Sequence, residues 1–90
     1  MEKLLNNTAA AFNNLDGDGV EAACARAGLS AADTATVAPL LANIVSAYEM
    51  VENSYDDEPL DYNAALESLG VTGNEKAVAL KLIGDDLGGF

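Results

Sequence analysis

The sequence predicts an all-α protein, a compact single-domain bundle of about five helices spanning residues 1–90. Between residues 37 and 55, apolar side chains recur three and four positions apart, which places them in one stripe along a helix. Half of the residues are hydrophobic, alanine is frequent among them, and no stretch alternates with the period of a strand. We therefore expect the helix of about 37–55 to be the longest and the centre of the core. Its stripe is formed by Val37, Leu40, Leu41, Ile44, Val45, Tyr48, Val51 and Tyr55.

Two shorter helices are predicted before this central one. The segment Asp16–Gly19 carries two glycines and should end the first helix. Asp18, with Glu21 three residues later, is expected to cap the second helix, and Gly28 fits the position just after its end. The apolar face of the first helix comprises Leu4, Leu5, Thr8, Phe12 and Leu15.

Pro39 leaves the start of the central helix open. Ser30 and Asp33 form a helix start signal, and a helix beginning there would run into Pro39. Proline lacks the amide hydrogen and clashes with the preceding turn. We expect either a kink near Ala38 or a break that leaves Pro39 in the first turn of the central helix.

Two more helices are predicted after the central one. Asp61 has the position of an N-cap, with Leu60 before it, and Gly70 should end that helix. Thr72 and Glu75 are spaced as a capping box for the last helix, which we expect to close near Gly84. Deep burial is expected for its wide apolar side, formed by Ala77, Val78, Leu80, Leu82 and Ile83.

The charge of the chain excludes several classes of function. Fifteen acidic residues against four basic ones give a formal net charge of −11, which repels nucleic acids and anionic membranes and attracts basic proteins. The sequence has no histidine, which excludes histidine-assisted nucleophiles and histidine metal sites, and it lacks a glycine-rich phosphate loop. We therefore expect no enzymatic activity, no cofactor and no metal.

The sequence also predicts a cytoplasmic protein. Cys24 is the single cysteine, so no internal disulfide can form, and a buried, inert thiol is expected on the inner face of the second helix. The first residues lack the pattern of a signal peptide, and no run of about 18 uninterrupted apolar residues predicts a membrane span.

One motif suggests a cation site. The stretch Asn14–Gly19 places oxygen ligands at alternate positions and glycine sixth, which matches the first half of an EF-hand or dockerin-type calcium loop. The twelfth position, which should supply a bidentate carboxylate, is Ala25. The pattern therefore favours a turn followed by a helix cap, and a weak calcium-binding domain is kept as an alternative.

The strongest functional signal is the distribution of acidic residues. No basic residue lies between Arg26 and Lys76, so we expect the nine acids in that interval to have no partner for an ion pair. Glu49, Glu52 and Asp56 are three and four residues apart, so they share one helical face. We define the acidic face as the six carboxylates Glu49, Glu52, Asp56, Asp57, Glu58 and Asp61.

The sequence therefore predicts a non-enzymatic module that binds a basic protein through the acidic face. Side chains at helical spacing lie about 5–6 Å apart, comparable to neighbouring phosphates, so a row of carboxylates can imitate a nucleic-acid backbone. The sharper hypothesis is an inhibitor of a nucleic-acid-binding protein, of the kind that phages and other mobile elements use, anti-CRISPR proteins included. Two alternatives remain open: an acidic surface that only confers solubility or salt tolerance, and a small helical assembly or adaptor subunit. The adaptor would use an apolar surface formed by Tyr48, Met50 and Tyr55 or by the last helix.

Overall fold

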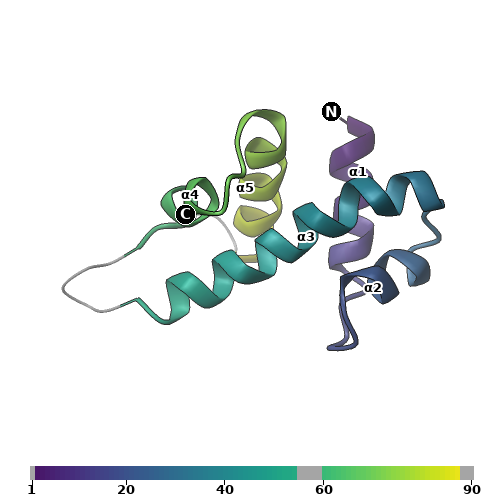
Figure 1. The fold of residues 1–90 in the computed structure, drawn as a ribbon, viewed down its shortest axis with the longest axis horizontal. Helices are drawn as coiled ribbons and strands as arrows, with labels where there is room; N and C mark the ends of the chain where they lie inside the picture. The colour runs from purple at the N-terminus through teal and green to yellow at the C-terminus, as the bar shows by residue number, and fades with distance from the viewer. Residues whose placement is uncertain (1, 55–59, 88–90) are drawn as a thin grey trace. The chain divides into compact units, whose positions relative to one another are not determined.

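The fold is all-α, as predicted. A computed structural model describes residues 2–54 and 60–87, of which 77% are helical and none lies in a strand. The five helices are α1 (Glu2–Phe12), α2 (Val20–Arg26), α3 (Ala31–Glu52), α4 (Tyr62–Ser68) and α5 (Gly73–Leu87) (Figure 1). By their internal contacts the residues form two compact units, Met1–Ala42 and Asn43–Phe90, and α3 contributes to both. The expectation of a single domain stays a prediction.

The first unit contains α1, α2 and the N-terminal half of α3. Alanines supply half of its buried cluster, and small side chains let helices approach closely. Cys24 is fully buried there, as predicted, and burial raises the pKa of its thiol, which keeps it protonated and unreactive. The buried cluster comprises Ala11, Ala23, Cys24, Val37, Ala38 and Leu41, with Leu4, Phe12, Leu15, Val20, Ala27 and Leu29 packed against it.

The second unit contains the C-terminal half of α3 with α4 and α5. Only one side of α5 is buried, so the prediction of a wide buried face is partly wrong. Ala77 is exposed and Leu80 is half-buried, because both point away from the side on which Val78 and Leu82 lie. The buried apolar residues of this unit are Ile44, Ala47, Ala65, Leu66, Val71, Val78, Ala79, Leu82 and Ile83.

Helix α3 begins at Ala31 rather than near Val37, and it runs through Pro39 without a break. The start signal is confirmed, because the Asp33 N–H donates to Ser30 Oγ at 3.1 Å. Pro39 has no N–H to donate to the carbonyl of Ala35. The Pro39 side chain is exposed, and buried apolar residues before and after it in the sequence hold the helix together. The helix ends at Glu52, and the expected end at Tyr55 lies outside the described residues.

The boundaries of α4 follow the predicted capping signals. The Asp61 carboxylate accepts a hydrogen bond from the Ala64 N–H at 2.7 Å. At the other end Gly70 adopts a φ of +83°, a left-handed conformation that glycine reaches without strain. The Val71 N–H then donates to the Leu66 carbonyl at 2.9 Å, which satisfies an acceptor of the last turn.

Helix α5 starts at Gly73, directly after Thr72, as the capping signal predicted. The expected end at Gly84 is wrong, because the helix continues to Leu87. A single glycine inside a helix costs only about 1 kcal/mol relative to alanine. Burial of Leu82 and Ile83 just before it is enough to keep the last turn helical.

Helix α3 is also long and apolar enough to cross a membrane, with a mean hydropathy of 1.2 over its most apolar 18 residues. A core helix of a soluble protein satisfies the same criterion of length and composition. Of that window 28% is buried in the two units, Val37, Leu41 and Ile44 included. The cytoplasmic location stays a prediction.

Replacing Thr8 by valine is expected to stabilise the fold by about 1 kcal/mol, because an unsatisfied buried hydroxyl carries a desolvation cost that an isosteric methyl group does not. The Thr8 side chain is fully buried, and its Oγ1 has no hydrogen-bond partner among the residues that the structure describes. Urea denaturation followed by circular dichroism measures the change. Thr36→Val is the control, since the Thr36 hydroxyl is exposed and donates weakly to the Ala32 carbonyl at 3.4 Å. A Thr8→Val protein less stable than the wild type would contradict the expectation.

Candidate functional site

The negative charge is concentrated in the second unit. Residues 1–42 contain five acids and two bases, whereas residues 43–90 contain ten acids and two lysines, so the formal charges are −3 and −8. Self-repulsion in the second unit lowers its stability, and the same field attracts cationic partners.

All four basic side chains of the protein lie in ion pairs. The pairs are Lys3–Asp33 at 3.4 Å, Arg26–Asp18 at 2.6 Å, Lys76–Glu67 at 3.4 Å and Lys81–Asp85 at 3.3 Å. Two of them correct the expectation that the nine acids between Arg26 and Lys76 have no partner, because Asp33 and Glu67 are reached by lysines from outside the interval. None of the four paired carboxylates belongs to the acidic face. Glu49, Glu52 and Asp61, the residues of the acidic face that the structure describes, therefore form no ion pair with these four side chains.

The structure describes three of the six residues of the acidic face. Glu49 and Glu52 are exposed in the last turns of α3, on one side of the helix. Asp61 is exposed just before α4. The other three predicted residues, Asp56, Asp57 and Glu58, lie outside the described residues. The expectation that Asp56 shares the helical face of Glu49 and Glu52 stays a prediction.

Asp61 also has a structural role. Its Oδ1 atom accepts the Ala64 N–H and caps α4, a contribution worth about 1 kcal/mol in a typical helix. A substitution at Asp61 would therefore change helix stability and surface charge together. Glu49 and Glu52 accept no such capping bond, which makes them the better positions for a binding test.

Tyr48, expected on an apolar assembly surface, makes a polar contact with α5. Its hydroxyl donates to Asp86 Oδ2 at 2.9 Å, and its ring lies edge-on to Tyr62 with centroids 5.5 Å apart and an interplanar angle of 73°. Burial raises the pKa of Tyr48, and the hydrogen bond to Asp86 and the negative charge of that carboxylate raise it further. The large apolar residue most exposed in residues 2–54 and 60–87 is Leu87, at 47%.

Replacing Tyr48 by phenylalanine is expected to make the free energy of unfolding fall less steeply as the pH rises above about 10. The pKa of Tyr48 in the folded protein lies above the ordinary value of 10.0, so the protonated phenol stabilises the fold. That stabilisation is fully present below pH about 10 and is lost as the pH rises further. At neutral pH the variant should be less stable by about 1 kcal/mol, the usual worth of one hydrogen bond. Urea denaturation between neutral pH and pH about 11 measures both effects, and equal pH slopes for the two proteins would contradict the assignment.

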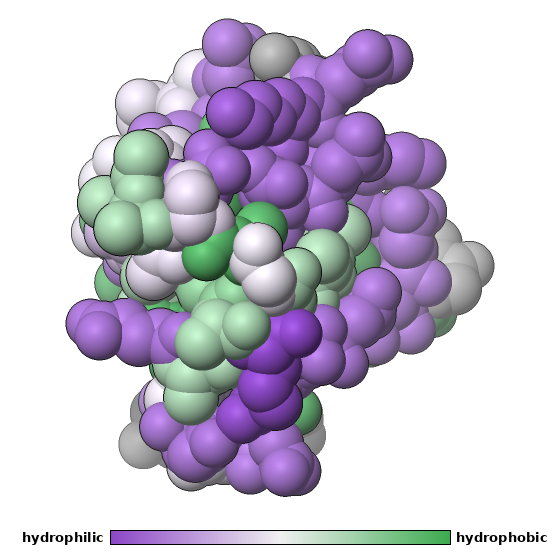
Figure 2. Space-filling model, turned by 90° about the vertical axis from the view of Figure 1, so that its right-hand side faces the viewer, coloured by the Kyte–Doolittle hydropathy of each residue, from purple (hydrophilic) through white to green (hydrophobic). Residues whose placement is uncertain are grey.

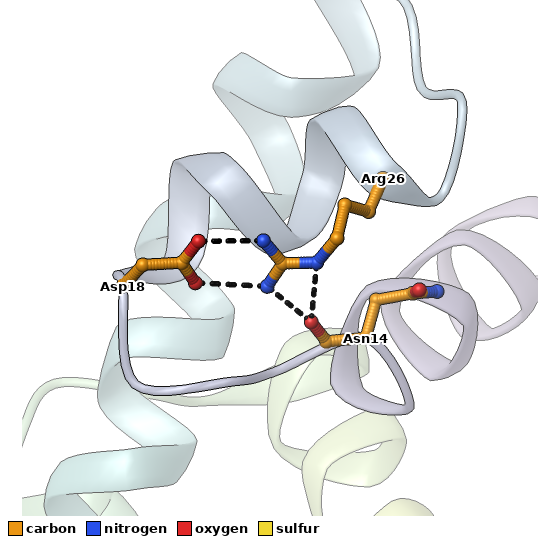
Figure 3. Close-up of polar contacts among 3 residues, drawn as sticks. All are labelled: Asn14, Asp18 and Arg26. Atoms are coloured by element: carbon orange, nitrogen blue, oxygen red, sulfur yellow. Dashed lines mark hydrogen bonds and ion pairs between the residues drawn. The ribbon is translucent and has the colours of Figure 1, made fainter.

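The loop between α1 and α2 is held by Arg26 rather than by a helix cap (Figure 3). The guanidinium forms a two-pronged pair with the Asp18 carboxylate, Nη1 to Oδ2 at 2.6 Å and Nη2 to Oδ1 at 2.9 Å. Its Nε donates to the Asn14 carbonyl at 3.0 Å, and Nη2 donates to the same oxygen. This carbonyl lies in the loop after α1, so Arg26 ties that loop to the C-terminal end of α2.

The predicted cap at Asp18 is therefore wrong. The N-cap position of α2 is Gly19, and a charge-assisted bidentate pair is stronger than a single bond to a backbone amide. The Arg26 hydrogen bonds lower the pKa of Asp18. In the calcium-loop alternative Asp18 would be a metal ligand, but its carboxylate is paired with Arg26. In the described part of the chain, no group of three or more His, Cys, Asp or Glu residues could hold a metal ion.

The chain matches no protein-family model, no curated protein and no solved structure. Its function is therefore inferred from the charges, burial and contacts described above.

Proposed function

We propose that this protein is a non-enzymatic acidic module that binds the basic surface of a nucleic-acid-binding protein. One observation carries the proposal: the second unit has a formal charge of −8, and both of its lysines are paired with carboxylates outside the acidic face. Glu49 and Glu52 are exposed, and no described basic side chain pairs with them. A cationic partner would supply the missing counter-charges.

The electrostatics favour a partner with clustered positive charge. On a helix, residues three apart, such as Glu49 and Glu52 of α3, have Cβ atoms about 5–6 Å from each other, comparable to the spacing of neighbouring phosphates. Holding two like charges together costs a few tenths of a kcal/mol per pair. In a basic channel of a partner, the attraction to positive charges would outweigh this repulsion. The finer proposal is an inhibitor that mimics a nucleic acid and occupies such a channel.

Charge reversal of Glu49→Lys and Glu52→Lys together is expected to reduce partner binding by at least about tenfold, because each substitution replaces an attraction by a repulsion. The matched control reverses two exposed acids of the first unit, Glu2→Lys and Asp16→Lys, with the same change in net charge. Both variants and the wild type are immobilised, exposed to a cell lysate and compared by mass spectrometry of the retained proteins. We expect the wild type and the control to retain the same nucleic-acid-binding proteins, and double-stranded DNA to displace them.

Salt distinguishes this function from that of an assembly subunit. A complex held by charge should dissociate in about 0.5 M salt, where the Debye length is only a few Å, whereas an apolar interface should persist. Equal retention by the charge-reversed variant, or retention that resists salt and DNA, would contradict the proposal. The exposed Leu87 at the end of α5 would then be the first residue to test in an apolar interface.

A further inference from the structure

The first unit carries a second surface feature, an open groove between α2 and the N-terminal half of α3. The groove has a volume of about 670 Å³. Along α3 it extends from Ala31 to Ala42, which corresponds to about 16 Å, or three helical turns. Its walls and floor are formed by Val20, Glu21, Ala25, Leu29, Ala31, Thr34, Ala35, Ala38, Pro39 and Ala42.

The residues by which α3 lines this groove are all uncharged. No charged residue occurs from Thr34 to Tyr48, and the exposed positions of α3 in the groove are filled by Ala31, Ala35 and Pro39. Figure 2 views the side of Figure 1 on which α2 and the first turns of α3 lie, and it shows apolar side chains grouped between hydrophilic ones. Small side chains on the walls leave room for the large apolar side chains of another molecule.

Two residues that line the groove carry hydrogen-bond acceptors relevant to a ligand. Glu21, the one charged residue that lines it, is exposed in the first turn of α2. The second acceptor is the carbonyl of Ala35, which receives no bond from position 39 because proline has no N–H. A carboxylate and a helix carbonyl match a cationic donor, an arginine or a lysine, and they repel a carboxylate.

We propose that this groove docks an amphipathic helix of a partner protein, with large apolar side chains in the groove and a basic residue against Glu21. Helix-in-groove recognition needs an apolar stripe about three turns long, which the groove provides. The charges argue against a second copy as the occupant, because each chain carries −11 and the groove offers it no basic side chain. This inference does not depend on the acidic face, which belongs to the second unit.

The probe for the test is a fluorescent peptide of leucine and lysine, about 14 residues long, patterned to place leucine on one face of a helix. A second peptide has serine in place of leucine and the same charge. Binding is measured by fluorescence anisotropy at physiological ionic strength. We expect the leucine peptide to bind at least about tenfold more tightly than the serine peptide, because apolar burial supplies the difference.

Two arginine substitutions on α3 distinguish binding in the groove from attraction of the peptide by the overall negative charge of the protein. Ala35→Arg introduces a large cationic side chain at a residue that lines the groove, whereas Ala32→Arg adds the same charge at an exposed position outside it. We expect the first variant to bind the leucine peptide at least about tenfold more weakly and the second to change binding less than about twofold. Glu21→Gln, a milder change at an exposed residue, should weaken binding about threefold. Circular dichroism confirms that the variants are folded.

Several outcomes would overturn the proposal. Equal binding by the two arginine variants, or equal binding of the two peptides, would show that charge alone holds the probe. Loss of binding only in the Glu49→Lys, Glu52→Lys variant would place the peptide on the acidic face. A wild-type dimer in sedimentation that Ala35→Arg dissociates would assign the groove to a second copy.

Discussion

Replacing Leu41 by alanine is expected to lower the free energy of unfolding by about 3 kcal/mol, within the range seen for large-to-small substitutions in cores. Leu41 is fully buried in the first unit, in a cluster with Ala11, Ala23 and Cys24. These neighbours have short side chains that cannot move into the vacated space. The variant therefore loses both the transfer free energy of the removed atoms and the contacts around the cavity.

Urea denaturation followed by circular dichroism measures this loss. Leu87→Ala is the control, since that leucine is 47% exposed and its removal should cost less than about 0.5 kcal/mol. Leu66→Ala, at a fully buried position of the second unit, should cost about as much as Leu41→Ala. A loss below about 1 kcal/mol at Leu41 would contradict its place in the core. Separate unfolding transitions, each sensitive to one of the two core variants, would contradict the prediction of a single domain.

The helix boundaries that could be predicted are those set by local chemistry. The side chains of Ser30 and Asp61 each accept a hydrogen bond from a backbone N–H in the turn that follows. Gly70 supplies a left-handed conformation at the end of α4. Each of these signals lies within a few residues of the helix end that it sets. Asp18 satisfies the same sequence rule and fails. A stronger partner, Arg26, reaches it from the far end of α2. Pro39 fails as a breaker for a related reason, because burial on either side of it outweighs the local cost.

The candidate site was predictable to a similar degree. The exposure of Glu49 and Glu52 follows from their spacing relative to the buried stripe of α3. The pairing of acids with bases did not follow, because Lys3 and Asp33 are thirty residues apart and only the tertiary fold brings them to 3.4 Å. The contact of Tyr48 with Asp86, on a different helix, was missed for the same reason. The groove of the first unit likewise depends on how α2 lies against α3.

Replacing Pro39 by alanine is expected to stabilise the protein by about 2 kcal/mol. Proline in a helix interior is about 3 kcal/mol less favourable than alanine, and the greater freedom of the unfolded alanine variant offsets up to about 1 kcal/mol of that difference. Pro39 is exposed inside α3, so the substitution removes little packing and restores the donor to the Ala35 carbonyl. Pro39→Gly also restores the donor but adds backbone freedom, and its stability should lie between those of the wild type and Pro39→Ala. Thermal and urea denaturation order the three proteins, and a less stable alanine variant would show that the proline ring is required for packing.

The same substitution connects the stability of α3 to the groove beside it. Proline at an exposed position inside the longest helix lowers stability, and it leaves the carbonyl of Ala35, a residue that lines the groove, without its usual donor. A docked helix that donates to this carbonyl would lose one hydrogen bond, worth about 1 kcal/mol, in the Pro39→Ala variant. This variant should then bind the leucine and lysine peptide about threefold to tenfold more weakly. It should also unfold at a higher temperature than the wild type. Stability and binding would then change in opposite directions at one residue, which is expected where a destabilising residue serves recognition. Unchanged peptide affinity in a stabilised variant would limit the groove's contribution to apolar contact and Glu21.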